Sequence, residues 1–278
     1  MSDRRLVINA DDFGLAPGVD DGIIEAASVG IVTSVSVVTN VRHRDDIRMS
    51  VEAIKRVAPG VGIGLHFNCV MGSPLTECRT LTDRDGKFAP AATLIRRALL
   101  HRVDEAEITA ECAAQLSVLQ EIVGTVTHLD GHLHLHVLPV FWGVVNRVAA
   151  QFGVRHVRLP LEPFNMNPLD VAATVRKVLD YLAWRSAGGT GPYGGERIRF
   201  TGMSLREEAH FSSRLLRLFR NLPAGITELM VHPGHHDAAL ARFTGYVEPR
   251  ANELVTLTSL AVRDRLSQEN ITLTSFGA

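Results

Sequence analysis

Strand-like and helix-like segments alternate along nearly the whole chain, and this alternation constrains the fold most strongly. Short runs of β-branched or apolar residues are each followed by a longer stretch with helical spacing, in roughly six to eight repeats. Such repetition predicts a parallel sheet with helices outside it. The number of units favours a closed or nearly closed α/β barrel over an open doubly wound sheet. We expect one domain covering residues 1–278, because the length and the 46% hydrophobic content suit a single large core.

The expected elements follow from apolar spacing and from glycine, proline and capping residues at their ends. The expected strands cover residues 6–10, 34–39, 61–66, 125–132, 154–159, 198–201, 228–232 and 271–275. The expected helices cover residues 17–29, 43–57, 89–100, 105–123, 139–152, 170–185, 205–222 and 250–268. The glycine-rich segment Gly188–Gly195 is either a lid over a site or a plain surface insertion, and residues 70–87 form a second candidate rim loop.

The overall composition excludes several classes of protein. The 29 basic residues nearly balance the 30 acidic ones, so no charge pattern indicates nucleic acid or an anionic membrane as a partner. No segment reaches the length of a membrane span, and the first apolar run is too short for a signal peptide. Three cysteines without paired spacing indicate reduced thiols, so we expect a cytoplasmic protein. A homodimer is an open alternative to a monomer, since dimers are the commonest assembly.

Polar residues stand at the ends of four expected strands. Asp11 and Asp12 end the first apolar run, and His66, His132 and His232 end later ones. The carboxyl ends of the strands in a parallel barrel lie on one face, where active sites are built. These five residues are therefore expected to converge, although they are far apart in the sequence.

Histidine and carboxylate together indicate a divalent metal ion. Eight of the twelve histidines lie in three short segments near expected strand ends. One carboxylate with two imidazoles leaves positions open for water and substrate, which is typical of a catalytic site. Two histidines favour zinc or another transition metal, whereas magnesium prefers oxygen ligands, and the identity of the metal stays open between them.

Each candidate residue also has a structural explanation. The pair Asp11 and Asp12 could cap the following helix, although a cap accounts for only one of them. His66 and His132 could be hydrogen-bonded core histidines. Asp130 could orient a ligand histidine or could form a turn before a glycine. Arg158 could contact a sugar or an anion, or could form a salt bridge.

The other clustered histidines are expected to play supporting roles. We expect His128 to form hydrogen bonds inside the barrel. His134 and His136 would share one face with His132 if that segment stays extended, and could then contact substrate, although a structural or surface role is favoured for His136. His235 and His236 are expected in an exposed loop near the mouth of the barrel.

Four segments together resemble the YdjC-like carbohydrate deacetylases, which include chitooligosaccharide deacetylases and a hopanoid-associated branch. The matching segments are NADDFG at 9–14, GLH at 64–66, THLDGHLH at 127–134 and HP at 232–233. The resemblance spans most of the chain and implies a distorted, TIM-like (β/α) barrel. It also implies that Asp12, His66 and His132 bind one divalent metal. A more distant similarity to NodB-type polysaccharide deacetylases implies Asp11 as the catalytic base and His232 as the catalytic acid.

The resemblance implies removal of an N-acetyl group from an amino sugar, an oligosaccharide or a glycolipid. The segment at 131–134 reads Gly-His-Leu-His, where the best-known chitooligosaccharide enzymes carry serine and an unbroken histidine run, so the substrate stays open. Two alternatives are a metal-dependent hydrolase of a phosphoester or cyclic amide and a non-catalytic sugar-binding barrel. A binder would need neither the acid nor the base.

Overall fold

The structure is a computed structural model that describes residues 3–162, 181, 198–205, 210–242 and 245–277. The glycine-rich segment Gly188–Gly195 and, apart from Tyr181, the expected helix at 170–185 lie outside the described residues. The strands are β1 (Arg4–Phe13), β2 (Ser34–Val37), β3 (Gly62–Phe67), β4 (His128–Gly131), β5 (His156–Val157), β6 (Arg199–Thr201), β7 (Gly225–Val231) and β8 (Ile271–Leu273).

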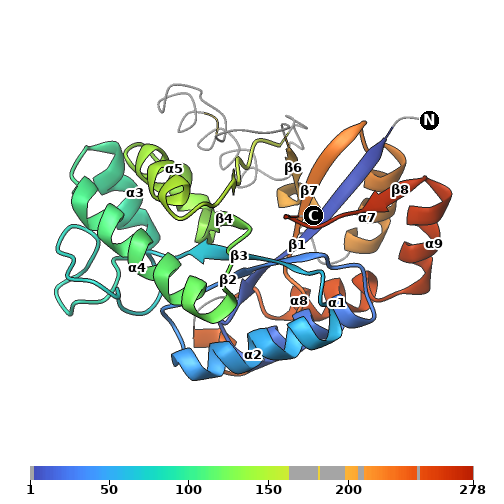
Figure 1. Cartoon of the computed structure of the whole chain (residues 1–278), viewed down its shortest axis with the longest axis horizontal. Coiled ribbons are helices and arrows are strands. Elements are labelled where there is room, and N and C mark those ends of the chain that lie inside the picture. The colour runs from blue at the N-terminus through green and yellow to red at the C-terminus, as the bar shows by residue number, and fades with distance from the viewer. Residues whose placement is uncertain (1–2, 163–180, 182–197, 206–209, 243–244, 278) are drawn as a thin grey trace.

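These strands form one parallel sheet in the order β5-β4-β3-β2-β1-β7-β6, and β8 also pairs with β1. The sheet is curved, and helices surround its outside (Figure 1). The described strands form a half-barrel that is open between β5 and β6. The expected α/β fold of the distorted-barrel, TIM-like type is confirmed.

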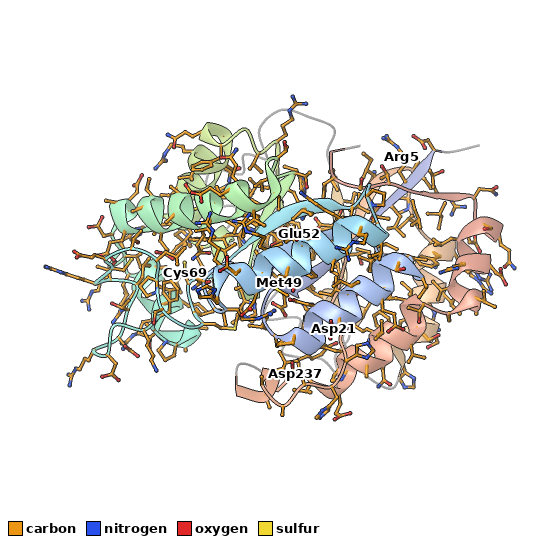
Figure 2. All side chains as sticks on the ribbon, turned by 60° about the horizontal axis from the view of Figure 1, so that its bottom comes forward. Arg5, Asp21, Met49, Glu52, Cys69 and Asp237 are labelled. Carbon is orange, nitrogen blue, oxygen red and sulfur yellow. The ribbon has the colours of Figure 1, made fainter. Side chains whose placement is uncertain are left out.

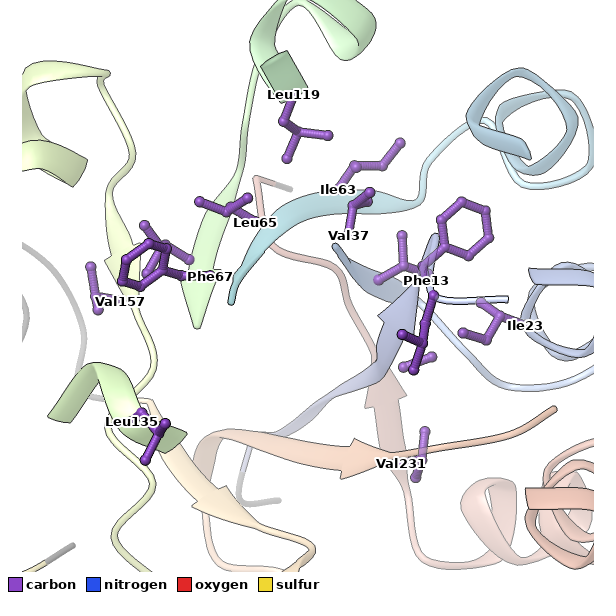
Figure 3. Packing of buried hydrophobic residues seen from close by; sticks show 14 of the residues in the cluster. Phe13, Ile23, Val37, Ile63, Leu65, Phe67, Leu119, Leu135, Val157 and Val231 are labelled. Carbon is purple, nitrogen blue, oxygen red and sulfur yellow. The ribbon is translucent and has the colours of Figure 1, made fainter. Parts of the chain in front are cut away.

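Helices cover the convex side of the sheet (Figure 1). They are α1 (Pro17–Ser28), α2 (Arg44–Val57), α3 (Ala91–Leu99), α4 (Glu105–Val123), α5 (Phe141–Gln151), α7 (Phe211–Arg220), α8 (Glu248–Leu257) and α9 (Leu260–Gln268). Polar residues such as Asp21 and Glu52 lie on the outer faces of α1 and α2 (Figure 2). Leucine, isoleucine, valine and phenylalanine side chains from the strands and helices meet in one large buried cluster (Figure 3).

Strand β1 lies inside the sheet and connects distant parts of the chain. Its Asn9 is level with Ser34 of β2 on one side and with Met230 of β7 on the other. Its first residues pair with β8, where Arg4 is level with Ile271. The neighbours of β1 therefore come from both ends of the sequence.

The segment after β4 differs from the sequence prediction. The expected strand at 125–132 is shorter, and His132 begins a 3-10 turn, η1 (His132–Val137). Leu133 and His134 adopt left-handed backbone conformations, with φ angles of 54° and 56°. The segment is therefore not extended, and the condition under which His134 and His136 would share a face with His132 is not met. A turn starts there because the strand has reached the end of its pairing with β3 at Gly131.

The last predicted helix is also divided. Instead of one helix over 250–268, α8 ends at Leu257 and α9 begins at Leu260. Ser259 caps the second helix, because its hydroxyl accepts a hydrogen bond from the Val262 N–H at 3.4 Å. A side chain that satisfies free N–H groups favours a new helix start over a continued helix. Within the helix predicted at 205–222, the described residues form α7, and residues 206–209 lie outside the described part of the chain.

The C-terminal residues close the lower end of the half-barrel, where the strands begin. The ring of Phe276 packs between the rings of His128 and His156, at centroid distances of 4.2 and 4.6 Å. The Phe276 N–H donates to the Ser34 hydroxyl at 3.2 Å. The end opposite the carboxyl ends of the strands is thereby filled with side chains.

The sequence argues against disulfide bonds and against membrane-spanning helices, and the structure can be compared with both expectations. Cys69, Cys78 and Cys112 are all free thiols in this structure. Among the helices in the described parts of the chain, none has the length and apolar character needed to cross a bilayer.

Candidate active site

The backbone at the end of β1 brings two adjacent carboxylates to one side. Consecutive strand residues normally face opposite sides of a sheet. Here the pairing register with β2 shifts between Ala10 and Phe13, and Asp12 has a left-handed φ of 72°. Both carboxylates are only 2% exposed. The N-cap of α1 is Ala16, so the explanation of the pair as helix caps is wrong.

Asp12, His66 and His132 lie close enough to share one ion. The Oδ1 atom of Asp12 lies 3.0 Å from Nδ1 of His132 and 3.3 Å from Nε2 of His66. The two ring nitrogens are themselves 3.3 Å apart. The three atoms form a nearly equilateral triangle supplied by the ends of β1, β3 and β4.

This triangle has the dimensions of one face of a metal site. Metal bonds of about 2.0–2.2 Å to nitrogen and oxygen place neighbouring ligand atoms about 3–3.5 Å apart. The donor set of two imidazoles and one carboxylate suits zinc and other divalent transition metals. The residues present therefore fit a divalent ion.

Asp130 orients His66 from behind. Its Oδ1 accepts a hydrogen bond from His66 Nδ1 at 2.6 Å, which leaves Nε2 facing Asp12 and His132. The register of β3 and β4 sets this contact, because His66 is directly level with Asp130. The hydroxyl of Ser36 donates to the other oxygen of Asp130 at 2.6 Å. Such a carboxylate behind a ligand histidine fixes the orientation of its ring.

Arg158 forms buried salt bridges with three carboxylates. Its Nη1 and Nη2 atoms donate to the two oxygens of Asp11, both at 2.7 Å. Nη2 also lies 2.7 Å from Asp130, and Nε donates to Glu228 at 2.7 Å. Of the two explanations offered for Arg158, the salt bridge is the one the structure shows, and its side chain is fully buried.

A second group of possible ligands overlaps the first. Asp11, His66 and Asp130 also lie close together. Both oxygens of Asp11 are already bound to Arg158, and Asp130 is bound to Arg158 and His66. The group with Asp12 is therefore the better candidate for the ion.

The charges of the cluster favour a cation. Burial opposes ionisation of Asp11, but the Arg158 guanidinium holds the pKa of that carboxyl well below its usual range. Burial opposes ionisation of Asp12 too, and Arg250 and His132 still lower its pKa strongly. Burial lowers the pKa of His66, but the charge of Asp130 and hydrogen bonds to Asp12 and Asp130 raise it to about 10. The carboxylates around His66 therefore stabilise its positively charged form, and the same carboxylates would favour a bound cation.

The net charge of the buried ion pairs also favours a bound cation. Among the described residues, four buried carboxylates are paired with two buried arginines, so these arginines alone leave an excess of two negative charges. A protonated His66, or a divalent ion bound to the neutral histidines, would offset this excess. The carboxylates are Asp11, Asp12, Asp130 and Glu228, and the arginines are Arg158 and Arg250.

His232 lies directly after β7, beside the carboxylates of β1. Its backbone N–H donates to Glu253 of α8 at 2.6 Å. Its ring meets Tyr246 edge to face at a centroid distance of 5.7 Å, and the Tyr246 hydroxyl donates to Glu253 at 2.7 Å. The positive charge of His232 contributes to the lowered pKa of Asp11, so the two residues interact electrostatically.

The remaining clustered histidines occupy two different environments. His128 is buried and contacts the Thr127 hydroxyl at 2.8 Å and the Ser36 hydroxyl at 3.2 Å, as expected for the barrel interior. His136 is buried, and its Nε2 donates to the Arg158 carbonyl at 2.9 Å, which is a structural role. His235 and His236 are exposed, as predicted.

Sequence reasoning missed three residues around the site. Glu228 could have been recognised from the sequence, because it is a charged residue within a largely apolar, buried strand. Arg250 and Glu253 lie on α8, and only a structure reveals that this helix reaches Asp12 and His232.

A curved parallel sheet with a carboxylate and two histidines at its carboxyl ends defines the class of an α/β-barrel protein with a candidate metal site. A family model described as YdjC-like protein matches residues 5–268. The chain belongs to the YdjC-like family, which confirms the sequence-based identification.

Two curated relatives are named carbohydrate deacetylase, one from Listeria welshimeri and one from Listeria monocytogenes. Each is 29% identical over 273 residues, which is 98% of this chain and 98% of the relative. A solved structure of a proposed cellobiose-phosphate cleavage protein from Enterococcus faecalis is 24% identical, with a TM-score of 0.78. The match covers 99% of this chain and 98% of that one, and it shows a shared fold.

Proposed function

We propose that the protein is a metal-dependent hydrolase that removes an N-acetyl group from an N-acetylated amino sugar, oligosaccharide or glycolipid. The observation that carries this proposal is the triangle of Asp12 Oδ1, His66 Nε2 and His132 Nδ1, with sides of 3.0–3.3 Å. The relatives named carbohydrate deacetylase support the class of substrate and the reaction.

Asp12, His66 and His132 would hold the ion. A divalent cation supplies Lewis acidity, which polarises a carbonyl and lowers the pKa of water. Zinc or another transition metal suits the two histidines, and magnesium stays an alternative. Asp130 keeps the Nδ1 proton of His66 in place, so that the Nε2 lone pair faces the triangle.

Asp11 is the proposed base. Arg158 binds both of its oxygens, which fixes the plane of the carboxylate and keeps it ionised at neutral pH. A carboxylate with so low a pKa keeps an accepted proton only briefly. We therefore expect Asp11 to release to the solvent the proton that it takes from water, and His232 to take up a proton from the solvent, before the next turnover.

His232 is the proposed acid. An amine is a poor leaving group unless it is protonated, and imidazolium can donate at neutral pH because its reference pKa is near 6.5. The hydrogen bond from the His232 backbone to Glu253 holds the residue at the end of β7, and the edge-to-face contact with Tyr246 limits the orientation of its ring.

Acetate release tests the proposal. Metal-stripped protein is reloaded with zinc, cobalt or magnesium and incubated with N-acetylated oligosaccharides and glycolipids. We expect acetate release that needs a metal and is lost in D12A and H132A together with bound metal. Bound metal and full acetate release in both variants would contradict the ligand assignment.

The same assay separates the alternatives. Phosphate release from a phosphorylated disaccharide, with two metals bound per chain, would favour a phosphoesterase. Sugar binding without turnover with any of these metals would favour a non-catalytic barrel. Cytoplasmic location, a homodimer and the single domain over residues 1–278 stay predictions, which cell fractionation, size-exclusion chromatography and limited proteolysis can test.

A further inference from the structure

The two oxygens of Asp12 have different partners. Oδ1 faces the ring nitrogens of His66 and His132, at 3.3 and 3.0 Å. Oδ2 accepts a hydrogen bond from Nη2 of Arg250 at 2.5 Å. Only one oxygen of this carboxylate is therefore available on the side of the two histidines.

Arg250 is held firmly in its position. Its side chain is among the largest that are fully buried, and the residue is 2% exposed. Its Nε donates to the backbone carbonyl of Tyr246 at 2.9 Å, and its guanidinium lies 5.9 Å from the centre of the Tyr246 ring. These contacts orient the guanidinium plane independently of Asp12.

Helix α8 connects Arg250 to the other half of the site. Glu253 lies one turn after Arg250 on this helix and accepts the backbone N–H of His232 at 2.6 Å. One short helix therefore holds both the carboxylate that faces the histidines and the residue proposed as the acid.

We propose that Arg250 is a positioning residue that restricts Asp12 to binding the metal through Oδ1 alone. The inference rests on the proposed function, because it assumes that Asp12 is a metal ligand. A carboxylate with both oxygens free can bind a metal through both and then occupies an additional coordination position. By engaging Oδ2, Arg250 keeps that position open for water and substrate, which a catalytic site requires.

The geometry, rather than the charge alone, is the essential part of the proposal. Lysine would keep the positive charge but has a single donor group and no planar fork. It cannot bind the Tyr246 carbonyl and Asp12 with the geometry of the guanidinium. R250K and R250M therefore test position and charge separately.

The test uses the visible absorption of the cobalt(II)-loaded protein, which reports the number of ligands and the geometry around the ion and needs no substrate. We expect both variants to show weaker cobalt absorption, as an additional ligand produces. We also expect kcat to fall about 10–100-fold, with KM changed much less, as is usual when a residue behind a metal ligand is lost. R147M is the matched control, because Arg147 forms an exposed ion pair with Glu105.

The outcomes are distinct. Unchanged cobalt spectra in both folded variants would overturn the proposal, and so would an R250K spectrum equal to that of the unmodified protein, since charge alone would then suffice. If R250M does not fold, R250K decides. Altered spectra in a protein that releases no acetate from any acetylated sugar would leave the positioning role standing and would remove the proposed function.

Discussion

Asp11 and Asp12 are neighbours in the chain but have different partners. Arg158 binds both oxygens of Asp11, so this carboxylate is fixed and has no oxygen without a partner. Asp12 keeps one oxygen directed at two histidines. At the scale of single residues, this difference supports the proposal that Asp12 binds the metal and leaves the role of base to Asp11.

The first prediction separates the two carboxylates. We expect D11N to lower kcat by about 10²–10⁴-fold, since a general base is removed, while the metal stays bound. D12A should lose both activity and metal. Metal content by elemental analysis and acetate release measure the two properties. Asp21, on the outer face of α1 (Figure 2), supplies the control D21N. Full turnover by D11N would refute its role as the base.

The second prediction concerns Arg158. Removing the cation from a buried ion-pair cluster leaves uncompensated charges, which costs about 3–5 kcal/mol. We expect R158M to lower the free energy of unfolding in urea by this amount. The double variant R158M/E228Q should recover part of the loss, because one of the buried carboxylates becomes neutral. A double variant no more stable than R158M would show that charge is not the cause.

At the scale of elements, helix α4 anchors the loop between β3 and α3. Its Glu111 accepts hydrogen bonds from the backbone N–H groups of Leu75 and Thr76, at 3.0–3.1 Å. One turn earlier, Glu107 accepts those of Arg79 and Thr80, at 2.9 and 2.8 Å. The loop residues 75–80 are therefore held against α4 by hydrogen bonds from their backbone.

The third prediction follows from these anchors. We expect the double variant E107Q/E111Q to increase amide hydrogen exchange in residues 75–80, because each charge-assisted hydrogen bond contributes about 1.5–3 kcal/mol. Exchange measured by mass spectrometry checks this. E121Q is the control, since Glu121 on the same helix forms an exposed ion pair with Arg44. Equal exchange in both variants would exclude the anchoring role.

The fourth prediction concerns the packing of β3 against β4. A Cβ atom on Gly64 would lie 2.5–2.6 Å from three ring atoms of His128. That ring cannot move freely, because Phe276 packs on it at 4.2 Å. We expect G64A to lose about 1–3 kcal/mol of stability in thermal unfolding. G60A, with open space around its Cβ, should change little. A G64A variant as stable as G60A would contradict the prediction.

Sequence reasoning located the elements better than their ends. The carboxyl-end positions of Asp12, His66 and His132 could be predicted because parallel strands present their ends on one face. The turn at Leu133 and the break before Ser259 could not, because local hydrogen bonding and the end of a strand pairing decide them. The contact between Arg250 and Asp12 joins residues 238 positions apart, and no local pattern encodes it.

At the scale of the whole molecule, buried neutral histidines make stability depend on pH. Burial is the main cause that lowers the pKa of His136 from 6.5 to about 4. Below pH 6.5 the unfolded chain binds a proton at this residue and the folded chain does not. The folded state therefore loses stability as the pH falls from 6.5 towards 4.

The fifth prediction states the magnitude of this loss of stability at low pH. We expect the free energy of unfolding to fall by about 3 kcal/mol over that range because of His136. Urea unfolding at pH 6.5 and pH 4 measures the change. H136Q should flatten the dependence, since an amide does not titrate. An equal slope in H136Q and in the unmodified protein would show that other groups cause it.

The pairing of β1 with strands from the far end of the chain has a consequence for how the protein assembles. β1 is synthesised well before its partners β7 and β8, which begin at residues 225 and 271. Contacts over such sequence distances form late and slow down folding. The strand that carries Asp11 and Asp12 therefore lacks its pairing with β7 and β8 until residues 225–231 and 271–273 have been synthesised. We expect the catalytic centre to be among the last parts of the protein to become ordered, and nascent chains to depend on protection from aggregation until then.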